Sequence, residues 1–163
     1  MEILNEESEQ IKEVFAHFGL AMYIAQGLER TLGIALATVY GPGPQKITKS
    51  EYENLLESNF QKTLGKLIND IRKTVEVSEA LESMLFESLK KRNCLAHNYF
   101  WERAIEFTSR NGRELMIREL IEIKNFLENV DSIFMEINEK WAEKHGVTKE
   151  ILEATFNKLI GNE

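Results

Sequence analysis

The spacing of hydrophobic residues predicts a chain built from α-helices. From about Glu6 to about Val39, apolar side chains recur at steps of three and four residues, which places them on one face of a long helix. The same spacing runs from about Ser50 to about Val75, and Asn59 marks a position where this second helix could break. Thr48 and Glu51 have the spacing of a capping box at its start. Residues 41–44, Gly-Pro-Gly-Pro, separate the two helices because prolines and glycines do not continue a helix.

Two further helices are expected in the second half of the chain. Ser78 is placed to cap a third helix, whose apolar stripe continues to Arg92 and Tyr99. Residues 109–112 have the composition of a tight turn, and a long fourth helix follows from about Arg113 to Lys144. Thr148 is placed to cap a short final helix. Because no segment has a convincing strand pattern, we predict an all-α fold: a single domain over residues 1–163, an up-and-down bundle of four long helices plus a short C-terminal helix.

Three glycines interrupt the first helix, and each costs about 1 kcal/mol relative to alanine. They are Gly19, Gly27 and Gly33. Glycine retained at this cost indicates that another helix approaches closely at these positions.

Composition restricts the class of protein. Hydrophobic residues make up 43% and charged residues 29% of the 163 positions, as in soluble globular domains. Cys94 is the only cysteine, so no intrachain disulfide can form. The N-terminus lacks a signal-peptide pattern and the most apolar window contains charges, so we expect a cytoplasmic protein that does not enter a membrane. A formal net charge of −7 argues against general nucleic-acid binding but leaves room for a local basic patch.

The densest candidate chemistry lies in residues 92–100, Arg-Asn-Cys-Leu-Ala-His-Asn-Tyr-Phe. Asn93 and His97 are four residues apart, so on a helix the amide oxygen could hold one imidazole N–H and leave the other nitrogen free for proton transfer. Arg92 and His97 are five apart and diverge by about 140° on an ideal helix, so they meet only if the helix ends or bends, if Arg92 reaches around, or if a second subunit completes the site.

Arginine and histidine together suit RNA cleavage by in-line attack of the 2′-hydroxyl. Arginine binds phosphate through parallel hydrogen bonds, and imidazole exchanges a proton near neutral pH. The stretch resembles the R-x4–6-H motif of the HEPN superfamily, here Arg92 and His97 with polar Asn93 directly after the arginine, and the R-x4-H-x-Y variant of HepT-type toxins, which adds Tyr99.

The resemblance implies a HEPN-like helical bundle that dimerises with two such motifs facing each other. It implies metal-independent ribonuclease activity, with no cofactor, often in toxin–antitoxin or phage-defence systems, and hence RNA and an antitoxin as partners. Arg92 and His97 would be catalytic and Asn93 would support the histidine. Tyr99 matches a position that a partner nucleotidyltransferase modifies with AMP. Lys90 and Lys91 complete the densest basic run and are candidate RNA-binding residues.

Two other interpretations stay open. Arg92 falls on the stripe that should meet other helices, where a guanidinium needs a partner, so an Arg–carboxylate pair inside the bundle is the simpler interpretation. The chain would then be a non-catalytic interaction or scaffold module. A ligand or nucleotide pocket within the bundle is the third alternative.

Overall fold

The computed structural model of the chain describes residues 2–43, 46–74, 76–150, 153–154 and 157. The described part is helical and contains no strand, which confirms the predicted all-α class. The helices are α1 (Glu2–Ala37), α2 (Lys49–Phe60), α3 (Leu64–Thr74), α4 (Glu79–Asn93), α5 (Tyr99–Glu102), α6 (Ala104–Phe107) and α7 (Arg110–Lys144), with a π-helical turn η1 (Cys94–Asn98) between α4 and α5.

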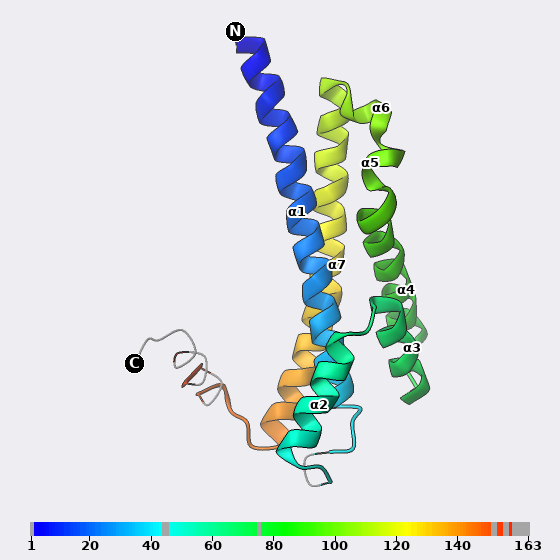
Figure 1. Ribbon diagram of the computed structural model, residues 1–163, viewed down its shortest axis with the longest axis vertical. Helices are drawn as coiled ribbons and strands as arrows, with labels where there is room; N and C mark the ends of the chain where they lie inside the picture. Colours follow the sequence, from blue (N-terminus) through cyan, green and yellow to red (C-terminus); the bar gives the residue numbers. More distant parts are fainter. Residues whose placement is uncertain (1, 44–45, 75, 151–152, 155–156, 158–163) are drawn as a thin grey trace.

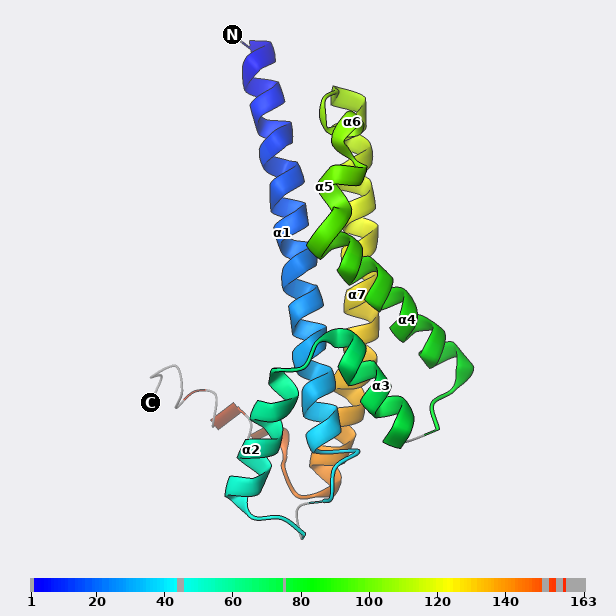
Figure 2. The same cartoon turned by 45° about the vertical axis from the view of Figure 1, so that its right-hand side comes forward.

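The two long helices α1 and α7 lie side by side and run parallel, and they form the spine of the molecule (Figures 1 and 2). One end of the spine is flanked by α5 and α6, and α2 and α3 pack beside the other end. Helix α4 crosses the spine obliquely, so that its C-terminal end lies against the middle of α1 (Figure 2). This crossing carries residues 92–100 to the junction of the three helices.

Among the described residues two helices, α1 and α7, are long, where the sequence indicated four. The second predicted helix is split into α2 and α3 by residues 61–63, which confirms the alternative of a break near Asn59. The buried Asn59 amide donates to the Gly33 carbonyl of α1 at 3.0 Å, and its oxygen accepts from Lys62 at 2.8 Å. These bonds fix the end of α2 against α1, and the chain then turns into α3.

Side-chain caps begin α2, α4 and α7. Thr48 and Glu51 form the reciprocal capping box of α2, and Ser78 accepts from the Leu81 N–H at the start of α4, as the sequence predicts. Ser109 accepts from the Gly112 N–H, so the last long helix begins at Arg110 and the predicted tight turn over 109–112 is wrong.

Glycine at position 112 has a steric cause in the first turn of α7. A Cβ atom added there would lie 2.0 Å from the Glu106 carbonyl oxygen, so only glycine fits. Of the three α1 glycines, Gly33 meets the Phe60 ring, 3.1 Å from where a Cβ would lie. Gly19 and Gly27 have no such neighbour within 4 Å in the described structure, so close helix approach is wrong as the reason for these two.

Aliphatic side chains of α1, α3 and α7 form the core, with Tyr99 the largest fully buried side chain. Within the described ranges, no helix is both long and apolar enough to cross a bilayer. Of the predicted final helix, Lys149 and Glu150 are helical, and most of the remainder lies outside the described residues.

The packing of α7 against its neighbours predicts that truncation of two leucines on this helix changes the free energy of unfolding by different amounts. Leu120 is fully buried, whereas Leu115 is 55% exposed. We expect Leu120→Ala to lower the free energy of unfolding by about 2–5 kcal/mol, because it removes buried methyl groups and leaves a cavity. Leu115→Ala is the matched control and should cost less than about 1 kcal/mol. Urea unfolding followed by circular dichroism measures both, and equal losses would contradict this description of the core.

Candidate functional site

The helix that carries the motif changes its winding within the motif. In η1 the Tyr99 N–H donates to the Cys94 carbonyl, a bond that spans five residues instead of four. A π turn of this kind takes more residues per turn, so residues five apart come closer to one face than they do in an α-helix. The sequence left open how Arg92 and His97 could approach each other, and the π turn reduces their angular separation.

Arg92 at the end of α4 is held by an ion pair with α1. Its Nε donates to Glu29 Oε1 at 2.8 Å, and its Nη1 donates to Asn93 Oδ1 at 3.3 Å. The two charged side chains are 23% and 21% exposed, so the pair is shielded from solvent but still reachable at one edge. This pairing confirms the predicted Arg–carboxylate contact within the bundle.

The guanidinium of Arg92 is only partly used by these contacts. It carries five N–H donors, and the bonds to Glu29 and Asn93 occupy two of them. In the described part of the chain, Nη2 has no hydrogen-bond partner. Arg92 is therefore fixed in orientation and keeps donors for an anionic ligand.

His97 lies on the exposed side of η1. The predicted bond from Asn93 is not formed among the described residues, because the Asn93 oxygen accepts from Arg92 instead. The π turn accounts for the difference, since it alters the α-helical spacing that would bring residues 93 and 97 together. Asn93 therefore supports the guanidinium, and the imidazole stays open to solvent.

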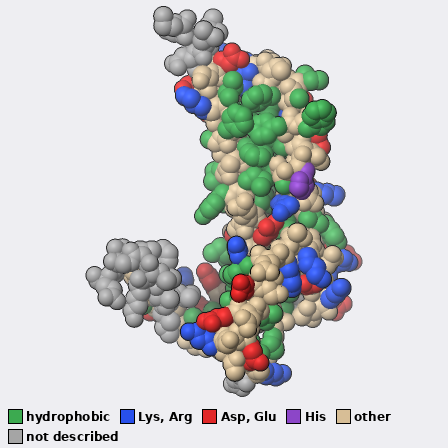
Figure 3. Space-filling model, viewed as in Figure 1, with side chains coloured by type: hydrophobic (Ala, Val, Ile, Leu, Met, Phe, Trp, Pro, Cys, Tyr) green, Lys and Arg blue, Asp and Glu red, His purple; other side chains and the backbone are tan. Residues whose placement is uncertain are grey.

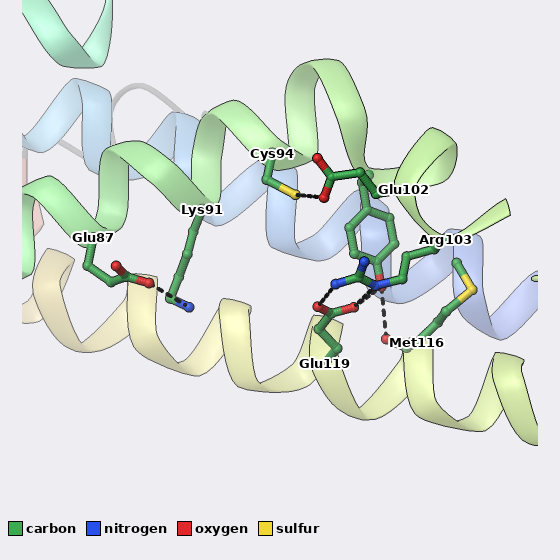
Figure 4. A network of polar contacts seen from close by, with 8 residues as sticks. Glu87, Lys91, Cys94, Glu102, Arg103, Met116 and Glu119 are labelled. Carbon is green, nitrogen blue, oxygen red and sulfur yellow. Dashed lines mark hydrogen bonds and ion pairs between the residues drawn. The ribbon is translucent and has the colours of Figure 1, made fainter. Parts of the chain in front are cut away.

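Tyr99 is buried in the bundle, and its hydroxyl joins a polar network with Arg103, Met116 and Glu119, which Figure 4 shows. Its hydroxyl lies 3.2 Å from the Met116 carbonyl and 3.2 Å from Glu119, which also binds Arg103 through both carboxylate oxygens. Burial, reinforced by the Glu119 charge, raises the pKa of the Tyr99 phenol well above its usual value. This placement does not favour Tyr99 as the acceptor of an AMP group, because its oxygen is enclosed.

Lys90 and Lys91 both lie close to the same carboxylate. Their amines are 3.8 Å and 3.2 Å from Glu87, and the Lys91 amine lies 5.3 Å from the centre of the Phe126 ring on α7. Lys91 is thus turned toward the spine (Figure 4). Lys90 is the more exposed of the two lysines, so its ammonium is the more accessible to a ligand from solution.

Sequence reasoning missed Glu29 and the Arg103–Glu119 pair. The sequence did indicate that a residue like Glu29 exists, because an arginine on a stripe that faces other helices requires a carboxylate from one of them. The identity of that carboxylate depends on how α4 crosses α1, which no spacing rule gives.

Comparison with protein-family models, curated proteins and solved structures found no match in any of the three.

The Arg92–Glu29 pair should show measurable coupling. In a double-mutant cycle of Arg92→Ala and Glu29→Ala, we expect a coupling free energy of about 1–2 kcal/mol, because both groups are largely shielded from water. The exposed Lys49–Glu53 pair, at 3.7 Å, is the control and should give a value near zero. Urea unfolding of the four chains in each cycle gives the energies, and indistinguishable cycles would show that the ion pair does not hold α4 to α1.

Glu119 should contribute to the acid sensitivity of folding. The hydrogen bonds from Arg103 hold the pKa of the Glu119 carboxyl below its usual value, so its contribution is present above about pH 5 and is lost as the pH falls through the lowered value. We expect Glu119→Gln to destabilise the protein at neutral pH, with a difference from the native chain that shrinks on acidification. Unfolding measured from about pH 7 to about pH 3 tests this. Glu128→Gln, elsewhere on α7, is the control, and a constant difference for Glu119→Gln would contradict the assignment.

Proposed function

We propose that the protein is a metal-independent endoribonuclease of HEPN type that cleaves RNA at a site composed by two copies of the chain. The observation that carries this proposal is the combination of an exposed imidazole, His97, within a π turn and an oriented guanidinium, Arg92, in the last turn of the helix before it. The resemblance of residues 92–99 to the R-x4-H-x-Y pattern agrees with it.

Each group has a chemical role that its environment supports. His97 takes the proton from the 2′-hydroxyl, whose oxygen attacks the phosphorus, and the imidazole of the second copy gives a proton to the departing 5′-oxygen. The reaction leaves a 2′,3′-cyclic phosphate on one product and a 5′-hydroxyl on the other. The free N–H groups of Arg92 donate to the phosphate oxygens, on which negative charge builds up in the transition state.

A hydrophobic area beside the motif supports assembly of two copies. Figure 3 shows hydrophobic side chains gathered over the part of α1 that lies beside α5 and α6, with charged side chains concentrated toward α2, α3 and α4. Phe15, half exposed on α1, packs against Phe100 and Phe107 at ring-centre distances of 5.2 and 5.8 Å. Trp101 and Ile105 are 86% and 84% exposed. Large exposed apolar side chains next to a site are typical of an interface.

RNA cleavage in the presence of EDTA tests the proposal. We expect the purified chain to cleave single-stranded RNA with EDTA present, to leave the matching DNA intact because DNA lacks the 2′-hydroxyl, and to lose at least about a hundredfold in rate on His97→Ala. His145→Ala is the matched control, since His145 lies at the far end of α7, where its ring bonds to the Trp141 carbonyl and stacks on the Trp141 ring. Absent cleavage, or cleavage that His97→Ala leaves unchanged, refutes the ribonuclease.

A non-catalytic interaction module is the second candidate function. It is favoured by the Arg92–Glu29 pair, which gives the guanidinium a structural role, and by the exposed Trp101 and Ile105. If the protein is a ribonuclease, an antitoxin would be one of its partners. If it is an interaction module, it would bind another protein. If the second candidate holds, Arg92→Ala lowers the melting temperature and no RNA is cleaved.

A further inference from the structure

A surface hollow of about 590 Å³ lies next to the Arg92–Glu29 pair. It is formed where α1 passes the end of α2, and Tyr23, Gln26, Gly27, Glu29, Arg30, Phe60 and Lys62 line it. Glu29 belongs both to the lining and to the ion pair, so the hollow adjoins the candidate site through one shared side chain. Its volume is in the range of small-molecule binding sites.

The hollow borders the part of α1 that faces the motif, and Glu29 is the side chain they share. Phe18 of α1 packs against Tyr99 and Phe100, and Glu29 of α1 binds Arg92, so residues 18–29 run antiparallel to residues 92–100. Along the axis of α1, Tyr23 and Gln26 lie between Phe18 and Glu29, beside η1. Glu29 borders both the site and the hollow, so an extended chain held at Arg92 can continue past Glu29 into the hollow.

The charges in the hollow favour an anionic ligand at one position. The Lys62 amine lies 3.0 Å from Asp70, and Glu29 is paired with Arg92. Arg30 has no carboxylate within ion-pair distance in the described ranges, and its guanidinium lies 4.5 Å from the centre of the Phe60 ring. Stacking fixes the plane of the guanidinium and leaves its N–H edge available for phosphate.

Tyr23 supplies a face for a nucleobase. It is 69% exposed, more than the other exposed large hydrophobic side chains described on α1, Phe15, Leu20 and Ile34. An exposed aromatic ring one to two helical turns from an unpaired arginine is the combination by which proteins hold single-stranded nucleic acid, with a base on the ring and a phosphate on the cation. The side-chain amide of Gln26, between them, can bond to a base edge.

We propose that this hollow is a nucleotide subsite for single-stranded RNA, in which Tyr23 stacks on the base next to the scissile phosphate and Arg30 binds the following phosphate. This inference deepens the proposed ribonuclease function and rests on it for the position of the scissile bond. The binding itself is a separate property, because neither Tyr23 nor Arg30 takes part in the proton transfers.

Equilibrium binding to the His97→Ala chain tests the subsite without cleavage. A short fluorescent oligoribonucleotide and an abasic oligomer of the same length are titrated at one fixed, low ionic strength, and anisotropy gives the Kd. We expect Arg30→Gln to raise the Kd for both probes about tenfold, because a charge-assisted phosphate contact is lost. Tyr23→Ala should raise the Kd about five- to tenfold for the base-bearing probe alone.

Lys12→Gln is the matched control, since Lys12 is an exposed cation on the same helix, outside the hollow and paired with Glu9. It should leave both Kd values within about twofold, the size of effect expected for a charge that touches no phosphate. Melting temperatures of all variants should stay near that of the His97→Ala parent, because the substituted side chains are exposed.

The result separates the subsite from the catalytic proposal. If the native chain cleaves no RNA while Arg30→Gln and Tyr23→Ala weaken binding as described, the subsite stands and the ribonuclease does not. The subsite is overturned if the His97→Ala chain binds no RNA. It is also overturned if Arg30→Gln and Tyr23→Ala change Kd no more than Lys12→Gln does, even where the native chain cleaves RNA.

Discussion

The mutual burial of the α1 and α7 apolar stripes is the interaction on which the rest of the structure depends. Leucines at 28, 32, 120 and 127 are fully enclosed between these helices and their neighbours. Each such side chain contributes about 1.5–3 kcal/mol relative to an exposed one. Because α2, α3 and α4 pack on α1, and α4 and α6 also contact α7, the spine determines where every group of the candidate site lies.

Polar contacts then select how the shorter helices sit on that spine. Asn59 ties the end of α2 to the Gly33 carbonyl, and Glu29 ties the end of α4 to the same helix one turn earlier. The buried Arg113 links the start of α7 to the Phe107 carbonyl and to Gln10 of α1. Apolar packing alone permits sliding between helices, whereas a bond to one specific partner fixes the register.

The Arg92–Glu29 pair is compatible with both candidate functions. The two functions differ in what they require of the Arg92 N–H groups that do not bond to Glu29 or Asn93. An arginine used only for structure would have its N–H groups satisfied within the bundle, since unsatisfied buried donors are costly. Arg92 instead keeps an edge open, close to an exposed imidazole and to a hollow with an unpaired arginine. That grouping is the observation behind the proposed RNA site.

The sequence by itself determined the helical class, the ends of the first, second and fourth helices to within a few residues, and the caps at Thr48 and Ser78. These features follow from local spacing and from bonds between residues three or four apart, which the sequence displays directly. It also indicated that Arg92 needs a carboxylate partner. It misplaced the start of α7, because Ser109 was taken as part of a turn and not as a cap.

Only the tertiary structure decided that the partner is Glu29, that the Tyr99 hydroxyl is enclosed by Glu119 and Met116, and that Asn93 serves the arginine rather than the histidine. The first two depend on helix crossings that join residues tens of positions apart. The third depends on a π turn, which breaks the spacing rule that any helical prediction assumes. The hollow beside Arg30 has the same origin, because its walls come from α1 and the end of α2 and exist only where those helices meet.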